Sequence, residues 1–307
     1  MRASHLIALL LMNVFWAASY AAFKVLSVRM AAGEIVTWRF TLAAAGLAAA
    51  WRWLPGRGPR GRDLLMASVM GVLVFVLGPR LQVLGVHWGQ AGDASVVVAL
   101  EPLVTAVGAA FFLREHVPPR RWIGFGLGMA GMIILNGGWK LELNSASMVA
   151  SLVFLSSFVC EASYSVLGKP LLERASPVKL IGAALLLGTA VNLLLDGPRA
   201  FAVVERMTFV DWASLAYLSV ICTLVGYTLW YVVIRDADVN LAALTILVQP
   251  VFGVAAAVIL AGESIHWGQL WGSLVVVAGL WLGFGASERS LPAATSVSPT
   301  AKAEGQG

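Results

Sequence analysis

The two halves of this sequence carry the same pattern of residues at a constant spacing. A Glu101-Pro102 pair lies in one apolar run and a Gln249-Pro250 pair lies in another, and subtracting 102 from 250 gives an offset of 148 residues. The same offset relates these further pairs: Asp63 and Asp211, Gly78 and Gly226, Glu115 and Glu263, Gly124 and Gly272, Gly131 and Gly279. An Ala-Ser-Tyr triplet at 18–20 recurs at 162–164. Two copies of one unit predict a pseudo-twofold structure with a site between the halves.

The composition predicts that the chain folds in lipid. Of its 307 residues, 59% are hydrophobic and 12% are charged, and the mean hydropathy is +0.84. A water-soluble globule of this composition would expose large apolar patches. Runs of about 20 apolar residues without period-two alternation favour membrane-spanning helices over barrel strands. We predict an all-α integral membrane protein with ten transmembrane helices, at 6–28, 35–53, 64–86, 91–113, 122–138, 148–168, 178–195, 212–234, 241–261 and 267–286.

The distribution of positive charge predicts the orientation of these helices. With the N-terminus inside the cell, 14 Lys and Arg residues fall on the cytoplasmic side, and four fall outside, namely Arg29, Lys140, Arg199 and Arg206. The positive-inside rule therefore predicts a multi-pass protein of the inner (plasma) membrane with both termini in the cytoplasm. Because each repeat holds five helices, an odd number, the two repeats are predicted to be inverted. The lipid bilayer is the expected partner, and the net charge of +5 does not indicate nucleic acid.

The repeat also sets the predicted domain boundaries. We expect a first five-helix repeat at 1–138, a second at 148–286, and a disordered cytoplasmic tail at 287–307, which is rich in Ser, Ala, Pro and Thr. No catalytic motif, nucleotide-binding glycine loop or metal-ligand spacing is found, and both cysteines fall inside predicted spans. The sequence therefore predicts no enzyme, no cofactor and no metal.

An acidic residue lies in the middle of the fourth predicted span. Glu101 is about ten residues from either end, and an acid at that depth costs a few kcal/mol, so it should face a cavity, carry a proton or hold a cation. Thr105 lies one helical turn away on the same face, and Thr245 and Gln249 form the equivalent stripe in the second repeat. Two interpretations stay open: a functional cavity acid, or an acid neutralised by Arg80.

Each of these two spans is interrupted by proline directly after the polar residue. Pro102 and Pro250 remove a helical hydrogen bond at matching depth. We interpret them as helix breaks with a gating role, with kinks made only for packing as the alternative.

Further polar and aromatic residues at helical spacing are candidates for lining a cavity. They are Asn13, Trp16 and Tyr20 in the first span, Glu161 and Tyr164 in the sixth, and Tyr227 and Trp230 in the eighth. Such groups usually face inward because lipid offers no hydrogen bonds. Ordinary aromatic packing or an interfacial belt is the alternative for Trp16 and Tyr20.

The intramembrane cations are interpreted individually. Arg80 is a candidate cavity residue that either pairs with Glu101 or binds a substrate carboxylate. Arg39 lies near a span end and is interpreted as an interfacial anchor, and Lys24 and Lys169 as residues whose amines reach the two membrane surfaces. A glycine stripe in the fifth and tenth spans indicates a scaffold or a subunit interface, so the chain is expected to be a monomer or a homodimer.

Taken together, these residues resemble the EamA-type family of the drug/metabolite transporter superfamily over nearly the whole chain. The resemblance rests on Phe15-Trp16, Lys24, Trp38-Arg39-Phe40, Leu100-Glu101-Pro102, Glu115, Gly124, Gly128 and Gly131, and on Pro250, Glu263, Gly272 and Gly279 in the second copy. It implies a ten-helix inverted-repeat fold, a cavity lined mainly by spans 1, 3, 4, 6, 8 and 9, and secondary transport of small metabolites, frequently the export of amino acids. Gln249 departs from the pattern because an acidic residue often stands there.

The leading functional hypothesis is a secondary transporter that exports small polar metabolites, foremost amino acids or related compounds, by alternating access. A second hypothesis within transport is an importer or efflux carrier of organic cations or drugs, attracted by Glu101 and Glu161. From another class come a membrane enzyme and a non-transporting membrane subunit. The absence of clustered catalytic residues and the paired broken helices disfavour both.

Overall fold

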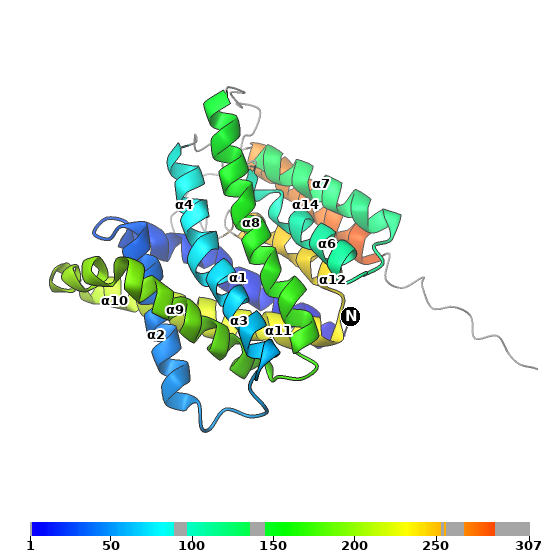
Figure 1. The fold of residues 1–307 in the computed structure, drawn as a ribbon. Helices are drawn as coiled ribbons and strands as arrows, with labels where there is room; N and C mark the ends of the chain where they lie inside the picture. The colour runs from blue at the N-terminus through cyan, green and yellow to red at the C-terminus, as the bar shows by residue number, and fades with distance from the viewer. Residues whose placement is uncertain (1, 89–96, 136–144, 253–254, 256–266, 286–307) are drawn as a thin grey trace, which may run out of the picture.

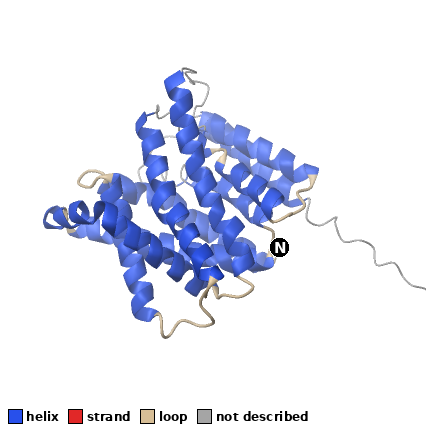
Figure 2. Cartoon of the chain, viewed as in Figure 1, coloured by secondary structure: helices blue, strands red, loops and turns tan. Residues whose placement is uncertain are grey.

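The computed structural model describes residues 2–88, 97–135, 145–252, 255 and 267–285, and every secondary-structure element in those residues is a helix (Figures 1 and 2). The all-helical prediction is therefore confirmed for the described part of the chain. The predicted tail at 287–307 and parts of the spans at 91–113, 122–138, 241–261 and 267–286 lie outside the described residues.

The helices follow the predicted order, and several spans are built from more than one segment. In chain order they are α1 (Ala3–Leu26), α2 (Ala32–Ala50), α3 (Arg62–Val72), η1 (Leu73–Leu77), α4 (Gly78–Trp88), α6 (Glu101–Phe112), α7 (Pro119–Leu135), α8 (Ser145–Leu171), α9 (Pro177–Ala202), η3 (Val204–Arg206), α10 (Phe209–Ala216), η4 (Tyr217–Val225), α11 (Gly226–Asp236), α12 (Val239–Leu244), η5 (Thr245–Val248) and α14 (Trp267–Gly285). The third predicted span comprises α3, η1 and α4, and the eighth comprises α10, η4 and α11.

The described helices are apolar enough to cross a membrane in several places. Five helical segments have the length and composition of membrane spans: Arg62–Gly85, Met148–Leu171, Pro177–Ala202, Phe209–Asp236 and Trp267–Gly285. Three shorter apolar helices are Ala3–Ser19, Glu101–Phe112 and Val239–Phe252. Large apolar side chains also face outward, since Leu194 is 84% exposed, Trp281 79% and Phe111 76%. An apolar exterior of this kind suits lipid rather than water. Ten crossings remain a prediction.

The third and eighth spans each contain a π-helical segment at the same repeat position. Adding 148 to 77 gives 225, so η1 and η4 end directly before the equivalent residues Gly78 and Gly226. A Cβ atom on Gly226 would lie 2.8 Å from Nε1 of Trp16, and one on Gly78 would lie 3.4 Å from Cβ of Cys160. Trp16 and Cys160 are themselves 144 residues apart. Gly226 therefore lets the eighth span approach the first helix of the other half, whereas Gly78 and Cys160 lie at ordinary contact distance.

Two ion pairs connect the halves in the same crosswise manner. Asp63 and Asp211 are repeat equivalents at the start of the third and eighth spans. Nη1 of Arg29, which follows α1, lies 3.1 Å from Oδ1 of Asp211, and Nη2 of Arg174, which follows α8, lies 2.9 Å from Oδ1 of Asp63. The first helix of each half is thereby linked to the third span of the other half.

The glycine stripes of α7 and α14 face each other within the chain. A Cβ atom on Gly131 would lie 2.7 Å from the carbonyl oxygen of Gly272, and one on Gly124 would lie 2.7 Å from that of Gly279. Figure 1 shows α7 and α14 lying side by side. The glycines allow this close backbone contact, so the stripe is an internal scaffold and does not offer a free surface to a second subunit.

Candidate functional site

A cavity of about 660 Å³ lies between the two halves. It is lined by Trp16, Ser19, Phe23, Ser27, Met30, Ala32, Ile35, Val36, Arg39, Phe40, Val74, Pro79, Gln82, Val83, Glu101, Thr105, Glu161, Tyr164, Ser165, Tyr227, Trp230, Ile246 and Gln249. Its volume is in the range of pockets that hold small molecules. The lining continues from the middle of α1 to the connection between α1 and α2, so the cavity opens at that end of the molecule.

Aromatic rings form the inner wall of the cavity. The Trp16 ring lies 5.6 Å from that of Tyr227 and 6.4 Å from that of Trp230, and the rings of Tyr164 and Tyr227 are 4.9 Å apart. The polar groups of three of these rings are bound: Trp16 Nε1 donates to the carbonyl of Cys222, the Tyr164 hydroxyl to that of Tyr227, and Trp230 Nε1 to Oγ of Ser165. The rings of Trp16, Tyr164 and Trp230 are thus held in place, and what they offer a ligand is apolar surface.

Two acidic side chains from different helices face this cavity. Glu101 is the first residue of α6, Glu161 lies in the middle of α8, and both line the cavity. Within the described residues, neither carboxyl accepts a hydrogen bond or forms an ion pair. Both acids are therefore available to a proton or to a cationic group.

Arg39 also faces the cavity, which corrects its interpretation as an interfacial anchor. Its Nε donates to Oγ1 of Thr223 over 2.9 Å, and the guanidinium carbon lies 5.7 and 5.2 Å from the ring centroids of Phe23 and Phe40. Sequence reasoning missed it because a cation near a helix end usually reaches the membrane surface. The Trp38-Arg39-Phe40 motif was the available signal.

Arg80 does not pair with Glu101, and that alternative was wrong. Its guanidinium donates to Asn192 and forms an ion pair with Asp196, both on α9. Arg80 is absent from the cavity lining described above. The partner acid Asp196 lies on α9, one residue beyond the span predicted at 178–195, and spacing along one helix gives no information on contacts between helices.

The remaining candidate polar residues are divided between the cavity wall and a buried cluster behind it. Thr105 and Gln249 line the cavity. Asn13 and Thr245 are fully buried; Asn13 donates to Oγ1 of Thr245 and accepts from Nε2 of Gln249. Asn13 and Thr245 therefore hold Gln249 in position instead of lining the cavity. The side chain of Tyr20 lies outside the described residues.

The helix is irregular on the N-terminal side of both candidate prolines. Residues 99–100 form a turn before Pro102, which occupies the first turn of α6, and the 3₁₀ segment η5 precedes Pro250. Proline lacks an N–H group and its ring clashes with the carbonyl four residues earlier, which explains these irregularities. Each break lies beside a lining residue, Glu101 or Gln249. Their gating role stays a prediction.

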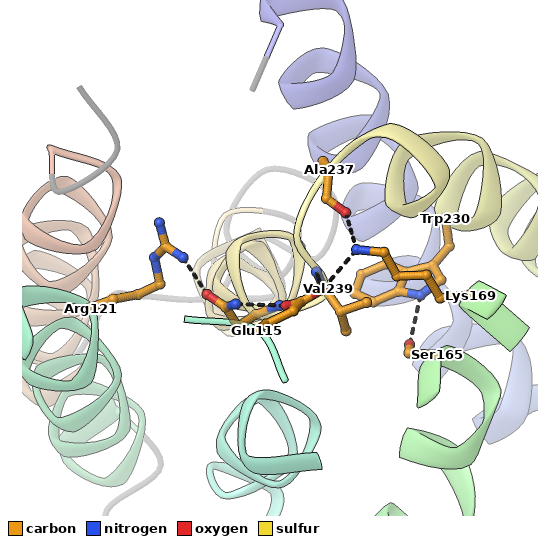
Figure 3. Close-up of polar contacts among 8 residues, drawn as sticks. Glu115, Arg121, Ser165, Lys169, Trp230, Ala237 and Val239 are labelled. Atoms are coloured by element: carbon orange, nitrogen blue, oxygen red, sulfur yellow. Dashed lines mark hydrogen bonds and ion pairs between the residues drawn. The ribbon is translucent and has the colours of Figure 1, made fainter. Parts of the chain in front are cut away.

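The opposite end of the molecule is closed by a polar network around Glu115 (Figure 3). Its Oε1 accepts from Nζ of Lys169 over 2.7 Å and from the backbone N–H of Val239 over 2.8 Å, and its Oε2 accepts from the backbone N–H and the side-chain amide of Asn240. Arg121 donates to the side-chain oxygen of Asn240. The network joins the α6–α7 connection, the end of α8 and the start of α12.

This network corrects the interpretation of Lys169 as a residue that only reaches the membrane surface. Its amine is bound to Glu115 and to the carbonyl of Ala237. The sequence signal for the Glu115 network was the recurrence of Glu115 as Glu263 in the second repeat. The side chain of Lys24, near the end of the equivalent helix of the first repeat, lies outside the described residues.

Glu115 is ionised near neutral pH. Burial acts to raise the pKa of its carboxyl, but hydrogen bonds from the backbone of Asn240, from Lys169 and from the backbone of Val239 lower the pKa below its ordinary value of 4.5. A carboxyl with a lowered pKa contributes stability above its ordinary pKa and loses it as the pH falls through the lowered value. The network is therefore expected to stay intact near neutral pH.

Comparison with known proteins decides the family. The model of the EamA-like transporter family matches residues 3–137 and again residues 148–284. This chain belongs to the EamA-like transporter family. It is accordingly a multi-pass membrane transporter. The two ranges that the family model matches follow one another along the chain.

Several known proteins resemble the chain along most of its length. It is 31% identical to the "Probable terminal-alkyne amino-acid exporter" of Streptantibioticus cattleyicolor over 282 residues, which cover 90% of this chain and 91% of the relative. An "Uncharacterized transporter" of Archaeoglobus fulgidus is 26% identical and covers 90% of this chain and 97% of its own length. The "Uncharacterized inner membrane transporter YedA" of Escherichia coli K12 is 27% identical over 73% of this chain and 72% of its own length.

A solved structure described as "Crystal structure of protein" has the same fold. It superposes with a TM-score of 0.77 and covers 92% of this chain and 99% of the other, at 17% sequence identity. At that identity the likeness concerns the fold.

Proposed function

We propose that this protein is a secondary transporter that exports amino acids or related small polar metabolites across the inner membrane by alternating access. The observation that carries the proposal is the cavity between the halves, whose described lining residues include one guanidinium, two carboxyl groups and aromatic rings. A cavity with both signs of charge and an apolar wall suits a zwitterion with an apolar side chain. The amino-acid exporter of Streptantibioticus cattleyicolor supports this substrate class.

The proposed architecture is two inverted repeats of five helices, with both termini in the cytoplasm. Support comes from the crosswise ion pairs of Asp63 and Asp211, from the equivalent π-helical segments, and from the packing of α2 on α9 and of α7 on α14, which are repeat counterparts. The lysine and arginine bias of the loops supports the orientation.

In this orientation the conformation is outward-open. The cavity opens at the α1–α2 connection, which lies on the proposed outer side, and the Glu115 network closes the cytoplasmic side. Alternating access then requires that this network break while the outer end closes. Glu115 and Lys169 would thus act in the cytoplasmic gate.

An export assay in cells tests the proposed function. Cells fed a phenylalanine-containing dipeptide accumulate the free amino acid, and overexpression of this protein is expected to increase its efflux rate several-fold over cells without the protein. Equal efflux from cells with and without the protein, at verified membrane expression, would contradict export of this amino acid.

Transport of organic cations is the second candidate, because two acids face the cavity against a single arginine among the described lining residues. The same cells distinguish it by their resistance to a toxic lipophilic cation. Increased resistance together with unchanged amino-acid efflux would favour this second candidate.

A further inference from the structure

Arg39 is the cation among the described residues that line the cavity, and it comes from one repeat alone. Adding 144 or 148 to its number gives Ala183 and Leu187, neither of which is charged. The site is therefore electrostatically asymmetric even though the fold is built from two similar halves. An asymmetric site can hold an asymmetric ligand in one orientation.

The local structure fixes the guanidinium and leaves its outer nitrogens available. Nε is bound to Thr223, and Oγ1 of Thr223 in turn donates to the carbonyl of Leu218 inside η4. The Phe23 and Phe40 rings lie beside the guanidinium, and Ser219 donates to the backbone carbonyl of Arg39. In the described part of the chain, neither terminal nitrogen has a hydrogen-bond partner. A planar fork fixed in this way is suited to a carboxylate, which it binds through two parallel hydrogen bonds.

The opposite charge lies on the facing helices. Glu161 on α8 lines the same cavity as Arg39, yet the two side chains form no ion pair. The rings of Trp16 and Tyr227 line the same cavity. A guanidinium and a carboxyl that face one cavity without pairing leave both charges to be neutralised by a ligand with two charges of its own.

We infer that Arg39 binds the carboxylate of the substrate and Glu161 its ammonium group, so that the substrate class is a free α-amino acid with an apolar or aromatic side chain. This assignment rests on the proposed function and sharpens it. Arg39 is then a specificity-determining residue, because a ligand that lacks the carboxylate leaves the guanidinium without a partner.

The test compares ligands that each lack one charge. L-phenylalanine has both groups, L-phenylalaninol has a CH₂OH group in place of the carboxylate, and N-acetyl-L-phenylalanine has no ammonium. Binding to the purified full chain is followed by the fluorescence of its tryptophans, two of which, Trp16 and Trp230, line the cavity. Flux of the same ligands is measured in proteoliposomes. We expect the wild type to bind L-phenylalanine at least about tenfold more tightly than either analogue, as expected for lost charged hydrogen bonds.

Substitution of Arg39 separates a binding role from a structural one. Arg39→Gln is expected to weaken L-phenylalanine and N-acetyl-L-phenylalanine at least about tenfold, since both bear the carboxylate, and to leave L-phenylalaninol unchanged or tighter because Glu161 loses a competing cation. Arg80→Gln, which removes an arginine paired outside the cavity, is the matched control and should keep the wild-type order of affinities. The wild-type comparison needs no variant to fold.

The outcomes distinguish this assignment from the proposed function. Flux of all three ligands by the wild type without preference for the carboxylate overturns the role of Arg39 and leaves transport intact. An unchanged order of affinities in a folded Arg39→Gln variant has the same consequence. If the folded wild type neither binds nor transports L-phenylalanine, the proposed function is overturned, and this assignment is overturned with it.

Discussion

Glu115→Gln is expected to open the cytoplasmic side of the protein. The carboxylate accepts four hydrogen bonds, and its side chain is 6% exposed. The glutamine amide cannot form the ion pair with Lys169. Its NH₂ group would also face groups that themselves donate hydrogen bonds. Removal of one partner from a buried charged pair costs about 3–5 kcal/mol. Even about 3 kcal/mol changes a two-state equilibrium by roughly 150-fold, so the closed end should open far more often.

Hydrogen exchange measures this opening directly. The backbone N–H groups of Val239 and Asn240 donate to Glu115, so the peptide that contains them should exchange about 100-fold faster in Glu115→Gln when exchange follows local opening. Asp63→Asn is the control, because it breaks the more exposed pair with Arg174, on the same proposed face, and such pairs contribute about 0–1 kcal/mol. Exchange of that peptide at the wild-type rate in Glu115→Gln would show that the network does not keep this end closed.

Glu101→Gln is expected to abolish the response of transport to a pH gradient. A carboxyl can take up and release a proton, an amide cannot, and Glu101 faces the cavity without a partner in the described residues. Because Arg80 is paired with Asp196, Glu101 is not required to neutralise it. A gradient of one pH unit stores about 1.4 kcal/mol per proton and can support about tenfold accumulation with one coupled proton. The wild type should show this accumulation in proteoliposomes, and Glu101→Gln should only equilibrate substrate.

The division of roles between the two acids makes this prediction specific. Glu161→Gln should weaken substrate binding, whereas Glu101→Gln should keep binding and lose coupling. Glu205→Gln, which alters an acid on η3 that is absent from the cavity lining, is the matched control. If well-expressed Glu101→Gln still accumulates substrate in response to the gradient, Glu101 is not the coupling acid and Glu161 becomes the candidate.

Features that depend on spacing along the chain could be predicted from the sequence. The 148-residue offset singled out Glu101 with Gln249 and the prolines that follow them, and the structure places both polar residues on the cavity with irregular helix before each proline. Long apolar runs without period-two alternation predicted the all-helical class because lipid leaves backbone groups no partner other than one another.

Features that depend on contacts between helices could not be predicted in this way. Arg39 was misinterpreted because its distance from a helix end suggested the membrane surface, whereas its orientation depends on Thr223 in η4 and on the Phe23 and Phe40 rings. Arg80 was expected to pair with Glu101 or a substrate, but its partner is Asp196, 116 residues away along the chain. Lys169 was expected to reach the membrane surface, but its partner is Glu115, 54 residues away. The π-helical segments left no signal other than the glycines that follow them.

Counterflow in proteoliposomes that contain only this purified chain tests the central claim most directly. Vesicles loaded with unlabelled L-phenylalanine are diluted into a trace of labelled L-phenylalanine, and a carrier that alternates access to one cavity accumulates label transiently without any other energy source. We predict a transient several-fold above protein-free vesicles in the wild type, and a reduced transient in Arg39→Gln. Label that never exceeds simple equilibration, with folded protein and with every amino acid offered, would contradict alternating access to an amino-acid site in this protein.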